Sequence, residues 1–266
     1  MLSQRILTSI FLVPLALWGL LLLDGTPFAL FCGLIATLAA WEWADLSGIS
    51  SQGRLVYAAS FAIGAGLWWS SHWSLESLLW LAGFFWPVAL FWVMTYPQLS
   101  RHWYGRKRRL LMGYAVLLPC WAGLILLHHQ AGLAWLLYLL LLVWIADIAA
   151  YFSGRRYGKA KLAPYVSPGK SWAGVWGALV ATSLLAWLAV PAMDLNAHQG
   201  MALWLITALT TAASVLGDLL ESMLKRYRGL KDSSRLLPGH GGILDRIDSL
   251  TAAAPIFMLL YTLSSL

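Results

Sequence analysis

Carboxylates within apolar stretches are the residues of this sequence best suited to chemistry. Asp218 lies inside such a stretch and is followed by Glu221, Ser222 and Lys225, at spacings of three, four and seven residues. Those spacings place the four side chains on one face of a helix. Asp147 lies near the end of an earlier apolar stretch. Because a carboxylate at membrane depth is costly, Asp147 and Asp218 are candidate functional residues.

Two further carboxylates, Asp245 and Asp248, precede the last apolar stretch. If the helices that carry Asp218 and Asp245 pack side by side, these acids meet. Neighbouring carboxylates repel each other unless they share a proton or a cation, and oxygen ligands without His or Cys suit Mg²⁺. The sequence therefore predicts Asp218, Asp245 and Asp248 as ligands of Mg²⁺ and leaves a second cation open. The alternative is structural: Asp245 would cap its helix, and Glu221 would pair with Lys225.

A basic, glycine-rich segment joins the two acidic groups. Its Lys and Arg side chains can balance the charge of a polyphosphate, and Gly239, Gly241 and Gly242 allow backbone N–H groups to approach phosphate oxygens. An ordinary basic loop would explain the charges but not the glycines. The candidate phosphate-binding residues of this segment are Lys225, Arg226, Lys231 and His240.

The segment 153–171 is a second candidate for phosphate binding. It ends in a Gly-Lys-Ser sequence at 169–171, which is similar to the end of a P-loop. However, Pro164 occupies the place of the first P-loop glycine, and no strand is expected before it. We therefore reject a P-loop and predict that Ser167, Lys170 and Ser171 bind phosphate as individual residues.

The composition indicates which elements hold these residues. Of the 266 residues, 60% are hydrophobic and 11% are charged, with a mean hydropathy of +0.71. Soluble domains have roughly 25% charged residues, so the composition argues against a soluble enzyme. Cys32 and Cys120 lie in apolar stretches without metal-binding spacing, which argues against a disulfide framework or a zinc site. The sequence predicts an all-α, polytopic integral membrane protein with a single membrane domain over 1–266.

About nine apolar stretches are long enough to cross a bilayer as helices. The stretch 26–43 is the least secure of them, because it carries Glu42 at its end. The stretches are 6–23, 26–43, 55–70, 75–94, 110–127, 133–152, 172–190, 201–224 and 249–266.

The basic residues predict the orientation of these helices. With a cytoplasmic N-terminus, the inner segments contain all 18 Lys and Arg residues of the chain. This distribution follows the positive-inside rule, and the basic inner face would attract anionic phospholipid and phosphate-bearing solutes. Nucleic acid is a weaker partner, because membrane spans interrupt the basic residues. The inner segments are 1–5, 44–54, 95–109, 153–171 and 225–248.

The longest polar stretches fall in the second half of the chain. We therefore assign the catalytic helices and cytoplasmic loops to 133–266, and leave the helices of 1–132 without a role. The sequence does not determine the oligomeric state, and a homodimer stays open.

The polar residues of this second half resemble the phosphatidate cytidylyltransferase family. The likeness covers the 27 residues from Ser222 to Asp248, including the Leu-Pro-x-His-Gly-Gly-x-x-Asp-Arg-x-Asp sequence at 237–248. The stretch 147–155 and the Ser-Pro-x-Lys sequence at 167–170 are also similar to that family. One departure is Ala173, where the family usually has Glu.

The resemblance implies a reaction, a cofactor and a location. CTP would condense with phosphatidate, held within the bilayer, to give CDP-diacylglycerol and pyrophosphate in a Mg²⁺-dependent reaction. The enzyme would lie in the plasma (inner) membrane of a bacterium, with its active site facing the cytoplasm. Asp218 and Asp245 would bind the metal beside Asp248 and Ser222. Phosphate contacts would come from Lys225, Arg226, Lys231 and His240, with Asp147, Ser167 and Lys170 completing the site.

Three other functions are alternatives. A transporter of a phosphorylated lipid would share the membrane helices, but it would place polar residues on both sides and often shows a repeat. A CTP-dependent enzyme acting on another lipid, such as a polyprenol kinase, would have nearly the same motifs. An inactive scaffold would have no need of the acidic and basic groups. The one-sided motifs favour an enzyme.

Overall fold

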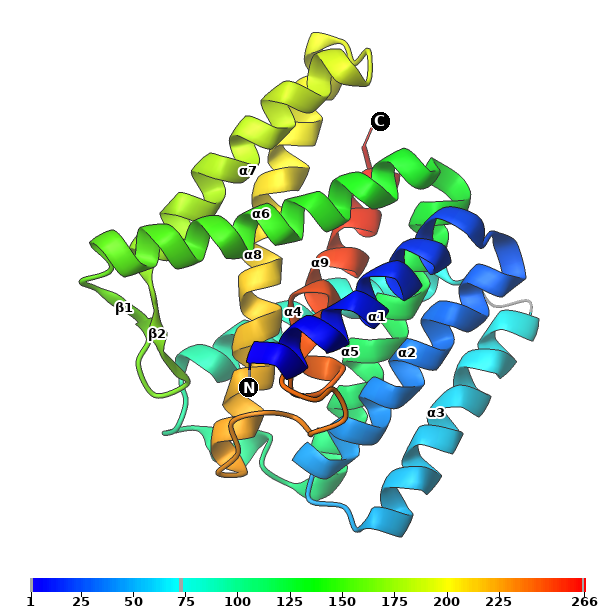
Figure 1. Cartoon of the computed structure of the whole chain (residues 1–266), viewed down its shortest axis with the longest axis vertical. Helices are drawn as coiled ribbons and strands as arrows, with labels where there is room; N and C mark the ends of the chain where they lie inside the picture. The colour runs from blue at the N-terminus through cyan, green and yellow to red at the C-terminus, as the bar shows by residue number, and fades with distance from the viewer. Residues whose placement is uncertain (1, 72–73, 265) are drawn as a thin grey trace.

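The computed structural model describes residues 2–71, 74–264 and 266, and its described part consists of α-helices with one small β-hairpin (Figure 1). Each predicted apolar stretch forms a helix whose bounds differ from the prediction by a few residues, so the all-α class is confirmed. The α-helices are α1 (Leu2–Leu22), α2 (Gly25–Leu46), α3 (Ser51–Ser70), α4 (Glu76–Met94), α5 (Arg106–Leu126), α6 (Leu133–Tyr157), α7 (Trp172–Ala192), α8 (Ala197–Tyr227) and α9 (Leu244–Thr262).

Short elements join some of these helices. A 3₁₀ turn, η1 (Ser100–His102), lies between α4 and α5, and a π-helical turn, η2 (Leu127–Ala131), extends α5. Between α6 and α7 the chain forms an antiparallel hairpin of β1 (Lys161–Ala163) and β2 (Ser167–Ser171). The sequence analysis did not predict this hairpin.

Six helices of the described part are long and apolar enough to cross a membrane: α2, α4, α5 with η2, α6, α7 and α8. The chain is therefore an integral membrane protein. The helices α1, α3 and α9 are not among the six, and α9 carries Asp245, Arg246 and Asp248 in its first turns. The full number of nine spans stays a prediction.

Close helix packing builds the core around α9. This helix packs against α8 and α5, while α6 packs along α7. Gly123 of α5 faces the backbone of Ala254 in α9 so closely that a Cβ at Gly123 would stand 2.9 Å from the Ala254 carbonyl. Small residues allow such close approach between helices in a membrane, where van der Waals packing replaces the hydrophobic effect.

Buried hydroxyl groups tie α6, α7 and α8 together. Tyr138 of α6 shares a hydrogen bond of 2.6 Å with Thr207 of α8. One turn further along α8, Thr211 donates to Thr182 of α7 at 2.9 Å. Hydrogen bonds between side chains on neighbouring helices stabilise membrane bundles. They fix α6 and α8, which carry Asp147 and Asp218, against α7, which directly follows the strand that carries Lys170.

Two tryptophans fix α2 against α5. Trp43 Nε1 donates to the carbonyl oxygen of Arg109 at 2.7 Å, and Trp121 Nε1 donates to that of Ala29 at 3.0 Å. These bonds lie near opposite ends of α2, so they set both its position and its tilt.

Basic segments gather at one end of the bundle. Arg228 Nε donates to the carbonyl oxygen of Asp45 at 3.2 Å, and the ring of Trp103 packs edge-on against Tyr227. Parts of 44–54, 95–109 and 225–248 therefore meet, at the lower end of the molecule in Figure 1, whereas the turn between α7 and α8 lies at the top. Which compartment this end faces stays a prediction.

Candidate active site

A cavity of about 630 Å³, which we call the hairpin cavity, lies between α6, the β-hairpin, α7 and α8. Ser171 shapes it, because its hydroxyl accepts a hydrogen bond from Gly174 N at 3.2 Å and so caps α7. Gly154 of α6 packs against that hydroxyl, which holds the ends of the two helices together. The charged and polar lining includes Asp147, Tyr151, Arg155, Lys161, Ser167, Lys170 and Asp218, and the apolar lining includes Leu162, Val175 and Val215.

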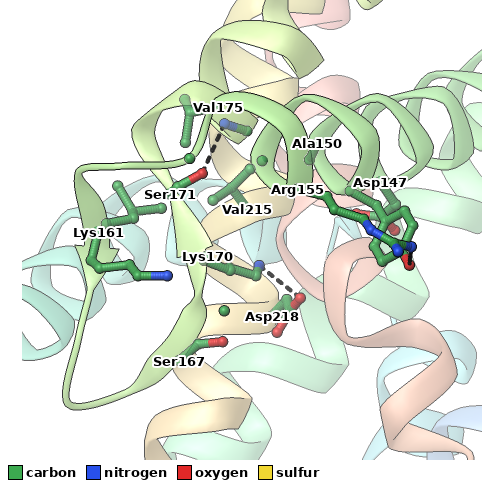
Figure 2. Close-up of a pocket in the computed structure, with 16 residues that line it drawn as sticks. Asp147, Ala150, Arg155, Lys161, Ser167, Lys170, Ser171, Val175, Val215 and Asp218 are labelled. Atoms are coloured by element: carbon green, nitrogen blue, oxygen red, sulfur yellow. Dashed lines mark hydrogen bonds and ion pairs between the residues drawn. The ribbon is translucent and has the colours of Figure 1, made fainter.

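Asp218 is the acidic centre of the hairpin cavity. Its Oδ2 lies 2.7 Å from Lys170 Nζ, and its Oδ1 accepts a hydrogen bond from Ser222 at 3.1 Å. Figure 2 shows Lys170 reaching from β2 to Asp218 on α8, with Ser167 and Lys161 directed into the same space. The structure thus brings together Asp218, Ser222, Ser167 and Lys170, which the sequence analysis had drawn from separate motifs.

Asp248 lies close to Asp218 across the contact between α8 and α9. Gly217 packs directly on the backbone oxygen of Asp248, so the two helices touch at this level. Burial, together with repulsion from the Asp218 carboxylate, raises the pKa of Asp248 to about 7. Asp147 of α6 lines the same cavity as Asp218. Asp147 and Asp218 therefore line the hairpin cavity, and the buried Asp248 interacts with Asp218 from outside that lining.

The predicted ligands Asp218, Asp245 and Asp248 do not form a single group. Among the described residues, no set of three or more His, Cys, Asp or Glu side chains is arranged to hold a metal ion. Both oxygens of Asp245 instead bind Lys225, Ser233 and Gly242. Asp218 is paired with Lys170, and Asp147 and Asp248 are its acidic neighbours, so this region offers carboxylate oxygens without forming a three-ligand site. That chemistry fits a hard divalent cation.

Lys225 is the centre of a buried ionic network. Its Nζ lies 2.5 Å from Glu221 Oε2 and 2.7 Å from Asp245 Oδ1, and the side chain is 9% exposed. The pairing of Glu221 with Lys225, which was the structural alternative, is therefore present. The capping alternative for Asp245 is wrong, because the N-cap residue of α9 is Ile243.

Asp245 is held by donors from the loop that joins α8 to α9. Its Oδ2 accepts hydrogen bonds from the Ser233 N–H and hydroxyl, each at 2.9 Å, and from Gly242 N at 2.7 Å. Burial alone would raise the pKa of Asp245, but the hydrogen bonds from Lys225 and these donors outweigh burial and hold the pKa below its usual value. Asp245 is thus a fixed anion that organises the loop.

The loop 228–243, which we call the α8–α9 loop, encloses a second cavity of about 430 Å³, the loop cavity. Its turn is closed by a hydrogen bond from Leu237 N to the Gly241 carbonyl at 2.8 Å, and Gly239 and Gly241 adopt φ of 78° and 83°. Such backbone favours glycine, as the sequence suggested. The lining includes Lys231, Asp232, Ser234, Arg235, His240 and Arg246.

Arg226 connects the two regions through backbone contacts. Its Nε donates to the carbonyl oxygen of Val166 in the hairpin at 3.3 Å, and its Nη1 donates to that of Leu230 at 3.0 Å. Neither cavity includes Arg226 in its lining. The observed contacts place Arg226 as a link between the hairpin and the α8–α9 loop.

Several residues of the site were not selected from the sequence. Lys161 and Arg155 line the hairpin cavity, and Arg235 and Arg246 line the loop cavity. The sequence signal that pointed to these four residues was their position in the basic segments 153–171 and 225–248. Glu42 was noted only as a weakness of its apolar stretch, although a lone carboxylate there is itself a signal of function.

Known proteins resemble this chain over nearly its whole length. The sequence model of the cytidylyltransferase family matches residues 3–264. A phosphatidate cytidylyltransferase of Pseudomonas aeruginosa is 51% identical over 261 residues, which covers 97% of this chain and 96% of the relative. A phosphatidate cytidylyltransferase of Haemophilus influenzae is 40% identical, covering 98% of this chain and 99% of the relative. This chain therefore belongs to the cytidylyltransferase family.

Proposed function

We propose that the protein is a phosphatidate cytidylyltransferase, which condenses CTP with phosphatidate to give CDP-diacylglycerol and pyrophosphate. Full-length relatives at 51% and 40% identity carry that name. The observation that carries the proposal is the pair of basic cavities at one end of a membrane bundle, with a cluster of carboxylates beside them. Two polyanionic substrates require such an arrangement.

The hairpin cavity suits the lipid substrate. It combines the cations Arg155, Lys161 and Lys170 with apolar walls from Val175 and Val215. A phosphate on a glycerol backbone, with acyl chains that stay in the bilayer, has the same division into charged and apolar parts. We assign the phosphatidate headgroup to this cavity.

The loop cavity suits the nucleotide. Lys231, Arg235 and Arg246 supply positive charge, and the turn at 237–241 presents backbone N–H groups from a glycine-rich segment. Cations and exposed backbone N–H groups are the usual partners of polyphosphate oxygens. We assign the triphosphate of CTP to this cavity.

The chemistry requires neutralisation of charge more than proton transfer. The second pKa of a phosphate monoester is about 6, so the attacking oxygen of phosphatidate is already anionic at neutral pH. That oxygen forms a bond to the α-phosphorus, and the bond from the α-phosphorus to the bridging oxygen breaks, with the electron pair leaving on pyrophosphate. Lys170 and Lys161 would hold the attacking phosphate, and the cations of the loop cavity would hold the leaving group.

A divalent cation, with Mg²⁺ as the expected ion, would be held by Asp218 and Asp248 with Asp147 beside them. When bound, it would neutralise phosphate oxygens during the transfer. Asp245 would act by fixing Lys225 and the α8–α9 loop rather than as a shared metal ligand. This assignment replaces Asp245 with Asp147 in the ligand set expected from the sequence.

We further propose that the protein lies in the inner membrane of a bacterium, with both cavities facing the cytoplasm. All 18 Lys and Arg residues fall in alternate segments between the apolar stretches, as the positive-inside rule requires for that orientation. Anionic phospholipid is the expected neighbour of this basic end, and a homodimer remains a prediction.

An assay with purified protein tests the function. The protein in detergent is incubated with CTP labelled in its α-phosphate, Mg²⁺ and phosphatidate, and the lipid fraction is extracted. We expect label in the lipid fraction only when phosphatidate is present. Label transfer from γ-labelled ATP or CTP to a polyprenol, without transfer from α-labelled CTP to phosphatidate, would contradict the proposal.

A further inference from the structure

Glu42 is a buried carboxylate that lies outside both cavities and has no role in the reaction as described so far. It lies near the end of α2, in the N-terminal half of the chain, and its side chain has no exposed surface. A buried charge is unfavourable unless hydrogen bonds compensate for it. The structure supplies that compensation from a distant part of the sequence.

Four neutral donors surround the carboxylate. Oε1 accepts from the Ser234 hydroxyl at 2.6 Å and from Ile243 N at 3.0 Å. Oε2 accepts from the Ser233 hydroxyl at 3.1 Å and from Leu244 N at 2.7 Å. The two N–H groups lie at the start of α9, where the helix dipole favours an anion.

These donors come from both ends of the functional part of the α8–α9 loop. Ser233 and Ser234 precede the segment 235–242, and Ile243 and Leu244 follow it. That segment carries Arg235 and His240 and lines the loop cavity. The single carboxylate of Glu42 therefore binds both ends of this segment and holds them together. We call these four hydrogen bonds the clasp.

The hydrogen bonds of Glu42 also connect it to the buried ionic network of Lys225. The Ser233 hydroxyl lies within hydrogen-bond distance of both Glu42, at 3.1 Å, and Asp245, at 2.9 Å. Asp245 in turn binds Lys225. A displacement of Glu42 would thus be transmitted through one serine to the buried ionic network of α8 and α9.

Little space is left around the Glu42 carboxylate, and the end of α2 that carries Glu42 is anchored. A Cβ on Gly242 would stand 2.6 Å from each Glu42 oxygen and would also contact the Ser233 hydroxyl, so only glycine leaves room at that position. The neighbouring Trp43 anchors this end of α2 to α5 through Arg109. Neither the end of α2 nor the α8–α9 loop can shift without breaking other buried hydrogen bonds.

We infer that Glu42 is a positioning residue that holds the α8–α9 loop in the conformation that binds the triphosphate of CTP. This inference rests on the proposed function for the identity of the ligand. It gives the N-terminal half of the chain a part in substrate binding. Glu42 touches no substrate and acts through the loop.

The test compares Glu42→Gln, Ser234→Ala and the double variant with the wild-type enzyme. Gln keeps the size of the side chain but presents an NH₂ group to donors, so part of the hydrogen bonding is lost. Hydrogen bonds to a charged group contribute enough that we expect the KM for CTP to rise about tenfold or more in Glu42→Gln. The KM for phosphatidate should change less than about twofold.

Two comparisons separate this role from others. If Ser234 acts through Glu42, the double variant should be no worse than Glu42→Gln, whereas independent roles would add. Glu76→Gln is the matched control, because Glu76 is exposed at the start of α4 and lines neither cavity. It should leave both KM values unchanged.

Hydrogen exchange in the absence of substrate provides a second readout. The amides of Ile243 and Leu244 should exchange at least about tenfold faster in Glu42→Gln, while the amides in the middle of α5 are unchanged. If the wild-type enzyme fails to use CTP and phosphatidate, the proposed function is wrong, and this exchange measurement alone decides whether Glu42 holds the loop.

Two results would overturn the inference. One is a Glu42→Gln enzyme with a wild-type KM for CTP and wild-type amide exchange. The other is a proportional loss of activity toward both substrates with faster exchange throughout the bundle, which would mean that Glu42 only stabilises the fold.

Discussion

At the scale of single residues, the site is a set of compensated charges. Asp218 forms an ion pair with Lys170 and accepts a hydrogen bond from Ser222. Asp245 forms an ion pair with Lys225 and accepts hydrogen bonds from Ser233 and Gly242. At Asp245 these contacts outweigh burial and hold the pKa of the carboxyl group below its usual value. The residues are therefore arranged to stabilise anions and cations in fixed places, which suits a reaction between two polyanions.

Replacement of Asp218 by Asn should stop turnover while the fold is kept. The amide has nearly the same shape but cannot balance Lys170 or bind a cation as strongly, so we expect transfer of label to phosphatidate to fall by at least about a hundredfold. Asp194→Asn, in the exposed turn between α7 and α8 at the opposite end of the bundle (Figure 1), is the control and should retain activity. Full activity of Asp218→Asn, with an unchanged unfolding temperature, would refute its assignment to the site.

Replacement of Lys225 by Met should destabilise the protein itself. Removing one partner from a buried ionic group leaves Glu221 and Asp245 without their cation, which costs about 3–5 kcal/mol. Thermal unfolding in detergent measures the change. Lys107→Met, which removes an exposed cation, should unfold like the wild type. Equal unfolding temperatures for all three proteins would show that Lys225 is not needed for the stability of the network.

At the scale of elements, close contact between α5 and α9 fixes the helix that carries Asp245 and Asp248. Gly123→Ala would place a methyl group 2.9 Å from the Ala254 carbonyl, and overpacking of this kind costs about 1–3 kcal/mol. Gly66→Ala in α3 is the matched control, because a Cβ there meets no atom within 4 Å. We expect a lower unfolding temperature for Gly123→Ala and an equal or higher one for Gly66→Ala.

The elements that could be predicted from sequence are those that depend on local pattern. Apolar stretches gave the helices to within a few residues, and spacing along α8 gave the pairs Asp218 with Ser222 and Glu221 with Lys225. The hairpin could not be predicted, since its polar segment is held by Ser171 and Gly154 at the meeting of two helices. The partners of Asp245 depend on the path of the α8–α9 loop, which no local pattern specifies.

At the scale of the whole molecule, one end of the bundle carries both cavities and the basic segments. The described cysteines, Cys32 and Cys120, are buried, so single introduced cysteines can report which side is exposed. In intact cells made permeable only at the outer membrane, Ala192→Cys at the opposite end should react with a maleimide that cannot cross the inner membrane. Lys107→Cys should react only after lysis. Labelling of Lys107→Cys without lysis would reverse the proposed orientation.

The distance along the chain between Glu42 and its donors has a consequence for biosynthesis. Ser233 follows Glu42 by 191 residues. At about 5–20 residues per second, roughly 10–40 s separate their emergence from the ribosome. During that time the carboxylate has entered its helix but none of its donors has been made. A chain that stalls before Ser233 therefore carries Glu42 without any of the four donors that compensate its buried charge.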